Sequence, residues 1–253
     1  MLYLAGLGLC SNDIPSSAVK LLGKTELYLE RYTSFIPDDT LSFIKEQTGK
    51  APTELKRADL EDGAKEFVAR AKAKDITLLV GGDPLVATTH KIIINEAAKQ
   101  GVSVSVVHAQ SILSAAIGES GLDFYRFGQI ITIPRWSEHY KPVSFYEIIE
   151  GNAKRKLHSL LLLDYDAETR SSLQPGEAVI TLLQAESEYK MGIISSDTKI
   201  LLLHNVSLAD KAIRYATLKE AQSIVFSIGP TLMIMPSALT DIEMETLRNR
   251  VTG

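Results

Sequence analysis

The sequence predicts an α/β fold in which helices flank a mostly parallel sheet, and three observations lead to this prediction. Short apolar runs alternate with helical segments through the first half of the 253-residue chain, which is the order strand, helix, strand. The connections are short, so parallel strands with right-handed crossovers are expected. From about Gly128 the apolar runs become shorter and suit hairpins, which favours a mixed sheet.

The length of the chain favours two domains over one core. We assign residues 1–128 to a first α/β domain and residues 129–253 to a mixed α/β domain. In the first, apolar runs predict strands, and amphipathic runs ended by glycines such as Gly49 predict helices. The expected strands are 2–7, 26–31, 76–80 and 102–107, and the expected helices are a short one before Gly23, then 40–48, 59–73, 89–100 and 112–117.

The second half is assigned by the same signals. The segment 134–142 holds two prolines and the only tryptophan, so we expect an irregular connector there. The segments 213–217 and 223–228 are short and ambiguous, and their spacing suits hairpins. The remaining expected strands are 129–133, 160–163, 199–203 and 232–235, and the helices are 145–156, 175–189 and 240–251.

Composition limits the classes of partner. Hydrophobic residues make up 45% and charged residues 23%, as in a globular protein. The net charge is −4 and no stripe of lysine or arginine is present, which argues against a direct nucleic-acid partner. Cys10 is the only cysteine, which fits a reducing cytoplasm. The apolar run from Met1 to Cys10 reads as a buried strand, not a signal peptide, and no run is long enough to cross a membrane.

The run Gly81-Gly82-Asp83-Pro84 directly follows a buried strand and precedes a helical segment. Two similar loops, Gly6 to Cys10 and His108 to Ile112, follow other expected strands. Ligands bind at the carboxyl edge of open parallel sheets, so the three loops are expected to share one ligand. Asp83 can accept from a ribose hydroxyl or an ammonium group, and Ser111 begins a helix with free N–H groups. The alternatives are that Gly81 to Pro84 is only a turn and Ser111 an ordinary N-cap.

Other catalytic patterns are missing from the sequence. The five histidines are scattered, without metal-ligand spacing, and neither a Gly-x-Ser-x-Gly element nor a Walker loop is present. No catalytic residue and no metal site are therefore assigned. Gly6-x-Gly8 followed by Glu30 partly matches a dinucleotide fingerprint, although Ser11 stands where its third glycine belongs. An NAD(P)-binding oxidoreductase is kept as an alternative function.

Several short stretches together resemble the diphthine synthases, a family in the tetrapyrrole-methylase class of S-adenosylmethionine-dependent methyltransferases. Each stretch is modest, but their order is specific and they cover nearly the whole chain. In chain order they are Gly6-Leu7-Gly8-Leu9, Glu30-x-Tyr32-Thr33-Ser34, Gly82-Asp83-Pro84-Leu85-Val86-Ala87-Thr88-Thr89-His90, His108-Ala109-x-Ser111-Ile112, Gly121-Leu122-x-x-Tyr125-x-Phe127-Gly128 and Leu157-His158-x-Leu160-Leu161-x-Leu163-Asp164.

The resemblance implies a two-domain tetrapyrrole-methylase-like fold and a homodimer, with S-adenosylmethionine in the cleft between the domains and S-adenosylhomocysteine as product. It implies methylation of the amino group of a 3-amino-3-carboxypropyl arm on one histidine of translation elongation factor 2, a step towards diphthamide. Carried over by position, the cofactor contacts are Leu9, Asp83, Val86, Ser111, Ile112 and Leu163, with Asn205 and Thr231 as further candidates.

The chain departs from the family pattern at the last two positions. It has Leu203-His204-Asn205-Val206 where the family tends to show Ala-Arg-Ala-Gly, and Thr231 where the family tends to place a histidine. Substitutions at these positions preserve contacts that the backbone makes with the cofactor, but not contacts that depend on the family's side chains.

The activated methyl group of the expected cofactor requires only that the amine be held in line and water be excluded. Asp164 or solvent takes the proton under this hypothesis. Besides the oxidoreductase, the alternatives are another methyltransferase of the class and a non-catalytic sensor of an adenosyl ligand.

Overall fold

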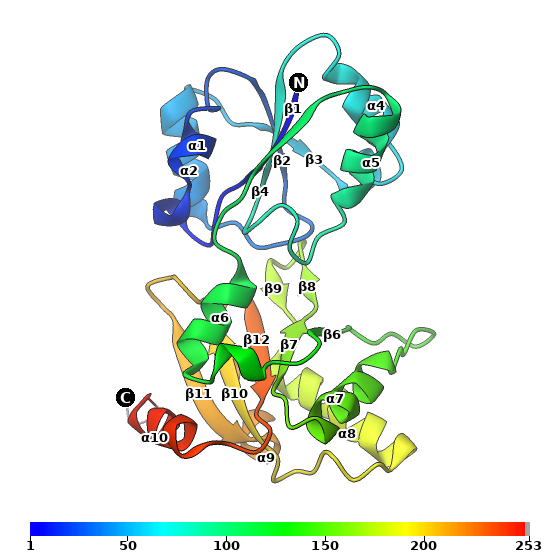
Figure 1. The fold of residues 1–253 in the computed structure, drawn as a ribbon, viewed down its shortest axis with the longest axis vertical. Helices are drawn as coiled ribbons and strands as arrows, with labels where there is room; N and C mark the ends of the chain where they lie inside the picture. The colour runs from blue at the N-terminus through cyan, green and yellow to red at the C-terminus, as the bar shows by residue number, and fades with distance from the viewer. Residues whose placement is uncertain (251–253) are drawn as a thin grey trace. The chain divides into compact units, whose positions relative to one another are not determined.

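A computed structural model of the chain describes residues 1–250, with the side chain of Arg250 excepted. The chain divides into two compact units, Met1–Ser114 and Ala115–Gly253, with the division inside helix α6 (Ile112–Ser120). The domain boundary expected after residue 128 stays a prediction. The expected α/β class, with a parallel sheet followed by a mixed sheet, is confirmed (Figure 1).

The sheet of the first unit is parallel throughout, as the short strand–helix–strand repeats predicted. β4 is buried along its whole length between β1 and β2. The strand order is β3 (Thr53–Leu55), β2 (Glu26–Glu30), β4 (Ile76–Val80), β1 (Leu2–Gly6) and β5 (Val104–Val107).

Helices cover both faces of this sheet, because successive strand residues alternate between two apolar clusters. Leu4 and Leu78 pack with residues of α3 (Arg57–Leu60), α4 (Ala64–Arg70) and α5 (Lys91–Lys99). Ala5 and Leu79 face the opposite side, towards α1 (Ser16–Val19) and α2 (Asp38–Thr48). A short 3-10 turn, η1 (Ser11–Asp13), follows β1.

The helix expected over 59–73 is wrong as a single element, because it is broken between α3 and α4. The Asp59 carboxylate caps α3 by accepting from the backbone N–H of Lys56 at 2.8 Å. The N–H of Gly63 then turns back to the carbonyl of Ala58, and Gly63 becomes the N-cap of α4. A side chain at Gly63 would meet the Asp59 carbonyl at 2.8 Å, so the turn depends on glycine.

The second unit has a mixed sheet in which β7 (Ser159–Leu163) pairs parallel with β6 (Ile131–Ile133) and antiparallel with β12 (Thr231–Met235). β10 (Lys199–His204) and β11 (Ala212–Thr217) complete it as a hairpin. α7 (Ser144–Lys154), α8 (Pro175–Tyr189) and α9 (Leu218–Ala221) pack on one face. The other elements are α6, η2 (Phe124–Arg126), the small hairpin β8 (Tyr165–Asp166) and β9 (Ser171–Ser172), and α10 (Asp241–Arg250).

The ambiguous segments of the second unit resolve differently. Residues 213–217 lie in β11, as the hairpin spacing suggested, but residues 223–228 form no strand. Thr217 and Glu220 form a capping box that starts α9 directly after β11, so a helix, not a second hairpin strand, follows β11. Val251, the last residue of the expected terminal helix, lies outside the described residues.

Candidate functional site

The carboxyl ends of four strands lie level at one edge of the first sheet. Gly6 and Glu30 both pair with Val80, and Val107 pairs with Ala5. The loops that follow these strands therefore leave from the same edge, as expected for the ligand edge of an open parallel sheet. They include the three loops that the sequence analysis predicted to share a ligand.

Backbone hydrogen bonds join the first two of these loops. The N–H of Gly8 donates to the carbonyl of Gly82 at 3.2 Å, and the N–H of Gly82 donates to the carbonyl of Gly8 at 2.8 Å. Both glycines have positive φ, 71° and 68°. A Cβ on Gly6 would lie 2.6 Å from the Gly82 carbonyl oxygen and 2.7 Å from the Ala109 Cβ. The absence of a side chain at Gly6 lets the loops meet.

Asp83 joins the second loop to the third. Its Oδ2 accepts from the backbone N–H of Ala109 at 3.2 Å and lies 2.8 Å from Nδ1 of His108. Its Oδ1 accepts from the N–H of Leu85 at 2.9 Å, which shapes its own turn. The residue is only 6% exposed. A carboxylate offers about four acceptor positions, so Oδ1 keeps capacity for one more donor.

Asp13 joins the first loop to the third, a contact that sequence reasoning missed. Its Oδ2 accepts from the N–H of Leu9 at 3.2 Å. With the amide of Gln110 oriented so that its nitrogen faces Asp13, that nitrogen lies 3.0 and 3.2 Å from the two carboxylate oxygens. Asp13 lies outside the recognised motifs and Gln110 is the variable position of one, so the only available signal was their position in the loops after β1 and β5.

The structure brings five of the predicted contacts to this edge. Leu9, Val86, Ser111 and Ile112 are half-buried, and Asp83 is buried. Val86 closes the Asp83 turn through its N–H to the Asp83 carbonyl at 3.3 Å. Ser111 immediately precedes α6, as predicted, and its carbonyl accepts from the Ser114 hydroxyl.

The other three predicted contacts gather at one end of the second sheet. Leu163 ends β7, Thr231 begins β12 and Asn205 follows β10. The antiparallel register pairs Thr231 with His204, and the N–H of Asn205 donates to the carbonyl of Pro230 at 3.0 Å. The eight positions thus form one group in each unit.

His204 brings an imidazole to the place where Thr231 departs from the family pattern. Its Nδ1 lies 2.8 Å from Thr231 Oγ1, and its ring stacks on Phe226 at 4.6 Å between centroids. Burial lowers the pKa of His204, although the charge of Asp210 acts in the opposite direction. The neutral imidazole is therefore the favoured form at this position.

Asn205 holds a buried oxygen without a hydrogen-bond partner. Its Nδ2 donates to Asp210 Oδ2 at 2.8 Å and to the carbonyl of Ile228 at 3.3 Å, so the orientation of its amide is fixed. Its Oδ1 is buried and unpaired. Its backbone is left-handed at φ 49°. The amide nitrogen, the backbone N–H and the carbonyl of Asn205 are thus all bonded within the unit, the last two to Pro230 and Leu208, and Oδ1 is the atom left without a donor.

A nucleoside cofactor fits the donors and acceptors at the first edge. Asp83 is a carboxylate with an unused acceptor position beside glycine turns that admit close approach, which suits a ribose hydroxyl. Among residues 1–250, no group of three His, Cys, Asp or Glu side chains is placed to hold a metal ion. Within the same residues, no helix has the length and apolarity to span a membrane.

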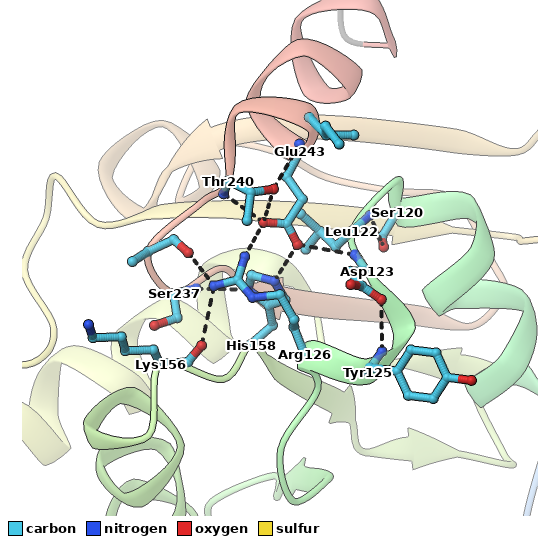
Figure 2. A network of polar contacts seen from close by, with 12 residues as sticks. Ser120, Leu122, Asp123, Tyr125, Arg126, Lys156, His158, Ser237, Thr240 and Glu243 are labelled. Atoms are coloured by element: carbon cyan, nitrogen blue, oxygen red, sulfur yellow. Dashed lines mark hydrogen bonds and ion pairs between the residues drawn. The ribbon is translucent and has the colours of Figure 1, made fainter.

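A second cluster of buried charge lies in the second unit, around Glu243 of α10 (Figure 2). The Glu243 carboxylate accepts from Arg126, from the N–H and hydroxyl of Thr240 and from the N–H of Asp123, and it lies 2.9 Å from His158 Nε2. His158 Nδ1 in turn accepts from the N–H of Ser237 at 3.0 Å. The donors of Arg126, Asp123 and His158 thus all reach the Glu243 carboxylate, and these bonds connect α10 with η2 and with the start of β7.

Comparison with known proteins places the fold in a class of enzyme. The family model of the Tetrapyrrole (Corrin/Porphyrin) Methylases matches residues 1–222. This agrees with the parallel sheet followed by a mixed sheet and with the ligand edge described above. The family match thus defines an S-adenosylmethionine-dependent methyltransferase.

Relatives over the full length narrow the class. The chain is 36% identical to diphthine synthase of Methanocaldococcus jannaschii, covering 98% of each chain. It is 36% identical to diphthine synthase of Methanothermobacter thermautotrophicus, covering 98% of this chain and 94% of the relative. A crystal structure of a diphthine synthase superposes with a TM-score of 0.87 at 30% identity, and the match covers 99% of this chain and 96% of that one. The chain therefore belongs to the diphthine synthase family.

Proposed function

We propose that this enzyme methylates the amino group of the 3-amino-3-carboxypropyl arm carried by one histidine of translation elongation factor 2. The full-length match to diphthine synthases carries the proposal. The convergence of the Leu9, Asp83 and Ser111 loops on one sheet edge supports the cofactor half of it.

The proposed cofactor is S-adenosylmethionine, with S-adenosylhomocysteine as product. In the first unit its contacts are Leu9, Asp83, Val86, Ser111 and Ile112. In the second they are Leu163, Asn205 and Thr231. Asp83 accepts from a ribose hydroxyl through the free position on Oδ1, and Asn205 contributes its unpaired Oδ1, because its Nδ2 is held by Asp210 and Ile228.

Bound cofactor supplies a methyl group already activated by a sulfonium. The protein's part is to hold the substrate amine in line with that methyl group, keep water out and receive a proton. Asp164 is the proposed acceptor: it directly follows the predicted contact Leu163 and is half-buried. Its Oδ2 accepts a hydrogen bond from the N–H of Arg135 at 3.1 Å, which holds the carboxylate in place.

Asp164→Asn tests this role. The amide keeps the shape and the bond to Arg135 but cannot accept the proton, so the methyl-transfer rate at fixed pH should fall by about tenfold to a hundredfold. The dissociation constant for S-adenosylhomocysteine should stay within about twofold of the wild type. Single-turnover kinetics and calorimetry measure the two quantities. An unchanged rate assigns proton removal to solvent.

Mass spectrometry of elongation factor 2 tests the function itself. The factor bearing the unmethylated arm is incubated with this enzyme and S-adenosylmethionine, and the modified peptide is weighed. The expected result is a gain of one or more methyl masses on that peptide, and the mass gives the number of methyl groups. Factor lacking the arm is the control. No gain, with S-adenosylhomocysteine still bound in calorimetry, would identify an adenosyl-ligand sensor instead.

The proposed setting is a cytoplasmic homodimer that contacts neither nucleic acid nor membrane directly. Twenty-seven basic residues against 31 acidic ones support the absence of a nucleic-acid partner. Sedimentation equilibrium of the full chain tests the oligomeric state, with twice the monomer mass expected.

A further inference from the structure

Glu30 and His90, which belong to two of the motifs found in the sequence, lie next to each other in the first unit. Glu30, at the end of β2, and His90, just before α5, are 0% and 1% exposed. His90 Nε2 lies 3.5 Å from Glu30 Oε1. Neither side chain is among the proposed cofactor contacts, so this buried pair has another role.

His90 holds the carbonyl of Pro84. Its Nδ1 lies 2.9 Å from that oxygen, and the hydroxyl of Thr88 donates to the same oxygen at 2.7 Å. A carbonyl only accepts, so Nδ1 of His90 must carry the hydrogen. The loop from Pro84 to His90 is thus closed on itself by two donors that share one acceptor.

The closed loop contains a strained residue. Ala87 has φ 55°, the left-handed region that a residue with a Cβ rarely adopts. Such a conformation persists only where surrounding contacts hold it. The two bonds to the Pro84 carbonyl span this residue, whereas the bonds to Asp83 from Leu85 and Val86 end before it. Ala87 directly follows the proposed cofactor contact Val86.

Glu30 lies on the other side of the imidazole ring, where His90 Nε2 is buried and makes no hydrogen bond to the described residues. Its Oε2 accepts from the N–H groups of Tyr32 and Thr33, each at 3.0 Å, and its Oε1 accepts from the Thr33 hydroxyl. These bonds hold the carboxylate in place. The bond from Nδ1 to the Pro84 carbonyl is therefore the contact that orients the His90 ring.

We propose that His90 is a positioning residue for the cofactor turn: through the Pro84 carbonyl it holds Val86 and Ala87 in the strained shape that presents them to the cofactor. This inference rests on the proposed function, because it takes the turn to be a cofactor contact.

Calorimetric titration of the full chain with S-adenosylhomocysteine tests the inference. His90→Leu removes the donor and should raise the dissociation constant about tenfold. His90→Asn places an amide N–H at the same reach as Nδ1 and should stay within about threefold of the wild type. A purely structural role predicts no such rescue, and an equal loss in both variants overturns the inference.

A second pair of variants examines the strain. Ala87→Gly makes positive φ free of steric cost, so in the His90→Leu background it should recover at least about threefold in affinity. His158→Leu is the matched control, since it removes an equally buried histidine in the second unit. It should lower the unfolding temperature without changing the dissociation constant.

The remaining outcomes are also decisive. A folded His90→Leu that binds like the wild type overturns the positioning role. If His90→Leu does not fold, Thr88→Val carries the test, because it removes the other donor to Pro84 from a half-buried side chain, and an unchanged affinity there overturns the inference. A wild-type chain that does not bind S-adenosylhomocysteine instead refutes the proposed function.

Discussion

Glu243 is a single residue whose carboxylate connects several parts of the second unit. Its burial pushes its pKa upwards, but hydrogen bonds from Thr240, His158 and the N–H of Asp123 outweigh this and lower the pKa to about 2. The ordinary value is 4.5. Because the folded state holds the charged form more strongly than the unfolded state does, this carboxylate stabilises the fold above pH 4.5.

We therefore predict a loss of stability in acid. As pH falls from 4.5 to about 2 the unfolded state binds the proton first, and the free energy of unfolding should drop by on the order of 3 kcal/mol. Burial also lowers the pKa of His158, which adds a loss in the same direction below its ordinary value of 6.5. Denaturant unfolding of the wild type and of Glu243→Gln at pH 7, 4.5 and 3 measures how the free energy of unfolding depends on pH. Equal pH dependence in the two proteins would contradict the assignment.

Some contacts between single residues could not be predicted from the sequence. Thr231 departs visibly from the family pattern, but nothing in the sequence says that His204 stands opposite it across the β10–β12 ladder. Asp13 and Gln110 were missed in the same way, because their contact joins residues nearly a hundred positions apart. Such pairings follow from strand register, which a single sequence does not reveal.

Among elements, those with complete local signals were predicted best. β4 is a continuous apolar run, and its expected bounds match Ile76–Val80. α8 begins with Pro175 behind a capping box from Gln174 and Glu177, and its expected bounds also match. β3 is only three residues long with a mostly exposed pattern, so it gave no periodic signal. The break between α3 and α4 was not predicted, because the helical spacing of apolar residues continues across it and gives a signal for one long helix.

The close approach of the three loops predicts that Gly6 tolerates no side chain. Gly6→Ala would place a Cβ against the Gly82 carbonyl and Ala109, so it should cost about 1–3 kcal/mol of unfolding free energy and weaken S-adenosylhomocysteine binding. Gly151→Ala in α7 is the matched control, because a Cβ there meets nothing within 4 Å and a helix favours alanine. Thermal unfolding compares the two, and equal melting temperatures would count against the loop geometry.

For the whole molecule, the account depends on one edge of the first sheet. The alternation of strands and helices predicted the class, and the resemblance identified the family that the full-length relatives support. Eight predicted contacts fall into one group in each unit, and the larger group is tied together by Gly8, Asp13 and Asp83. The central claim is that this edge holds the cofactor.

The same substitution at opposite ends of β4 tests that claim most directly. Asp75 precedes the strand and pairs with the N-terminal amine at the amino edge, whereas Asp83 follows the strand at the carboxyl edge. Calorimetric titration with S-adenosylhomocysteine should give Asp75→Asn the wild-type dissociation constant. For folded Asp83→Asn it should be at least about tenfold weaker, because asparagine keeps only one of the two acceptor oxygens that Asp83 uses for the Ala109 N–H and the proposed ribose hydroxyl. Equal affinity in the two variants would contradict the account.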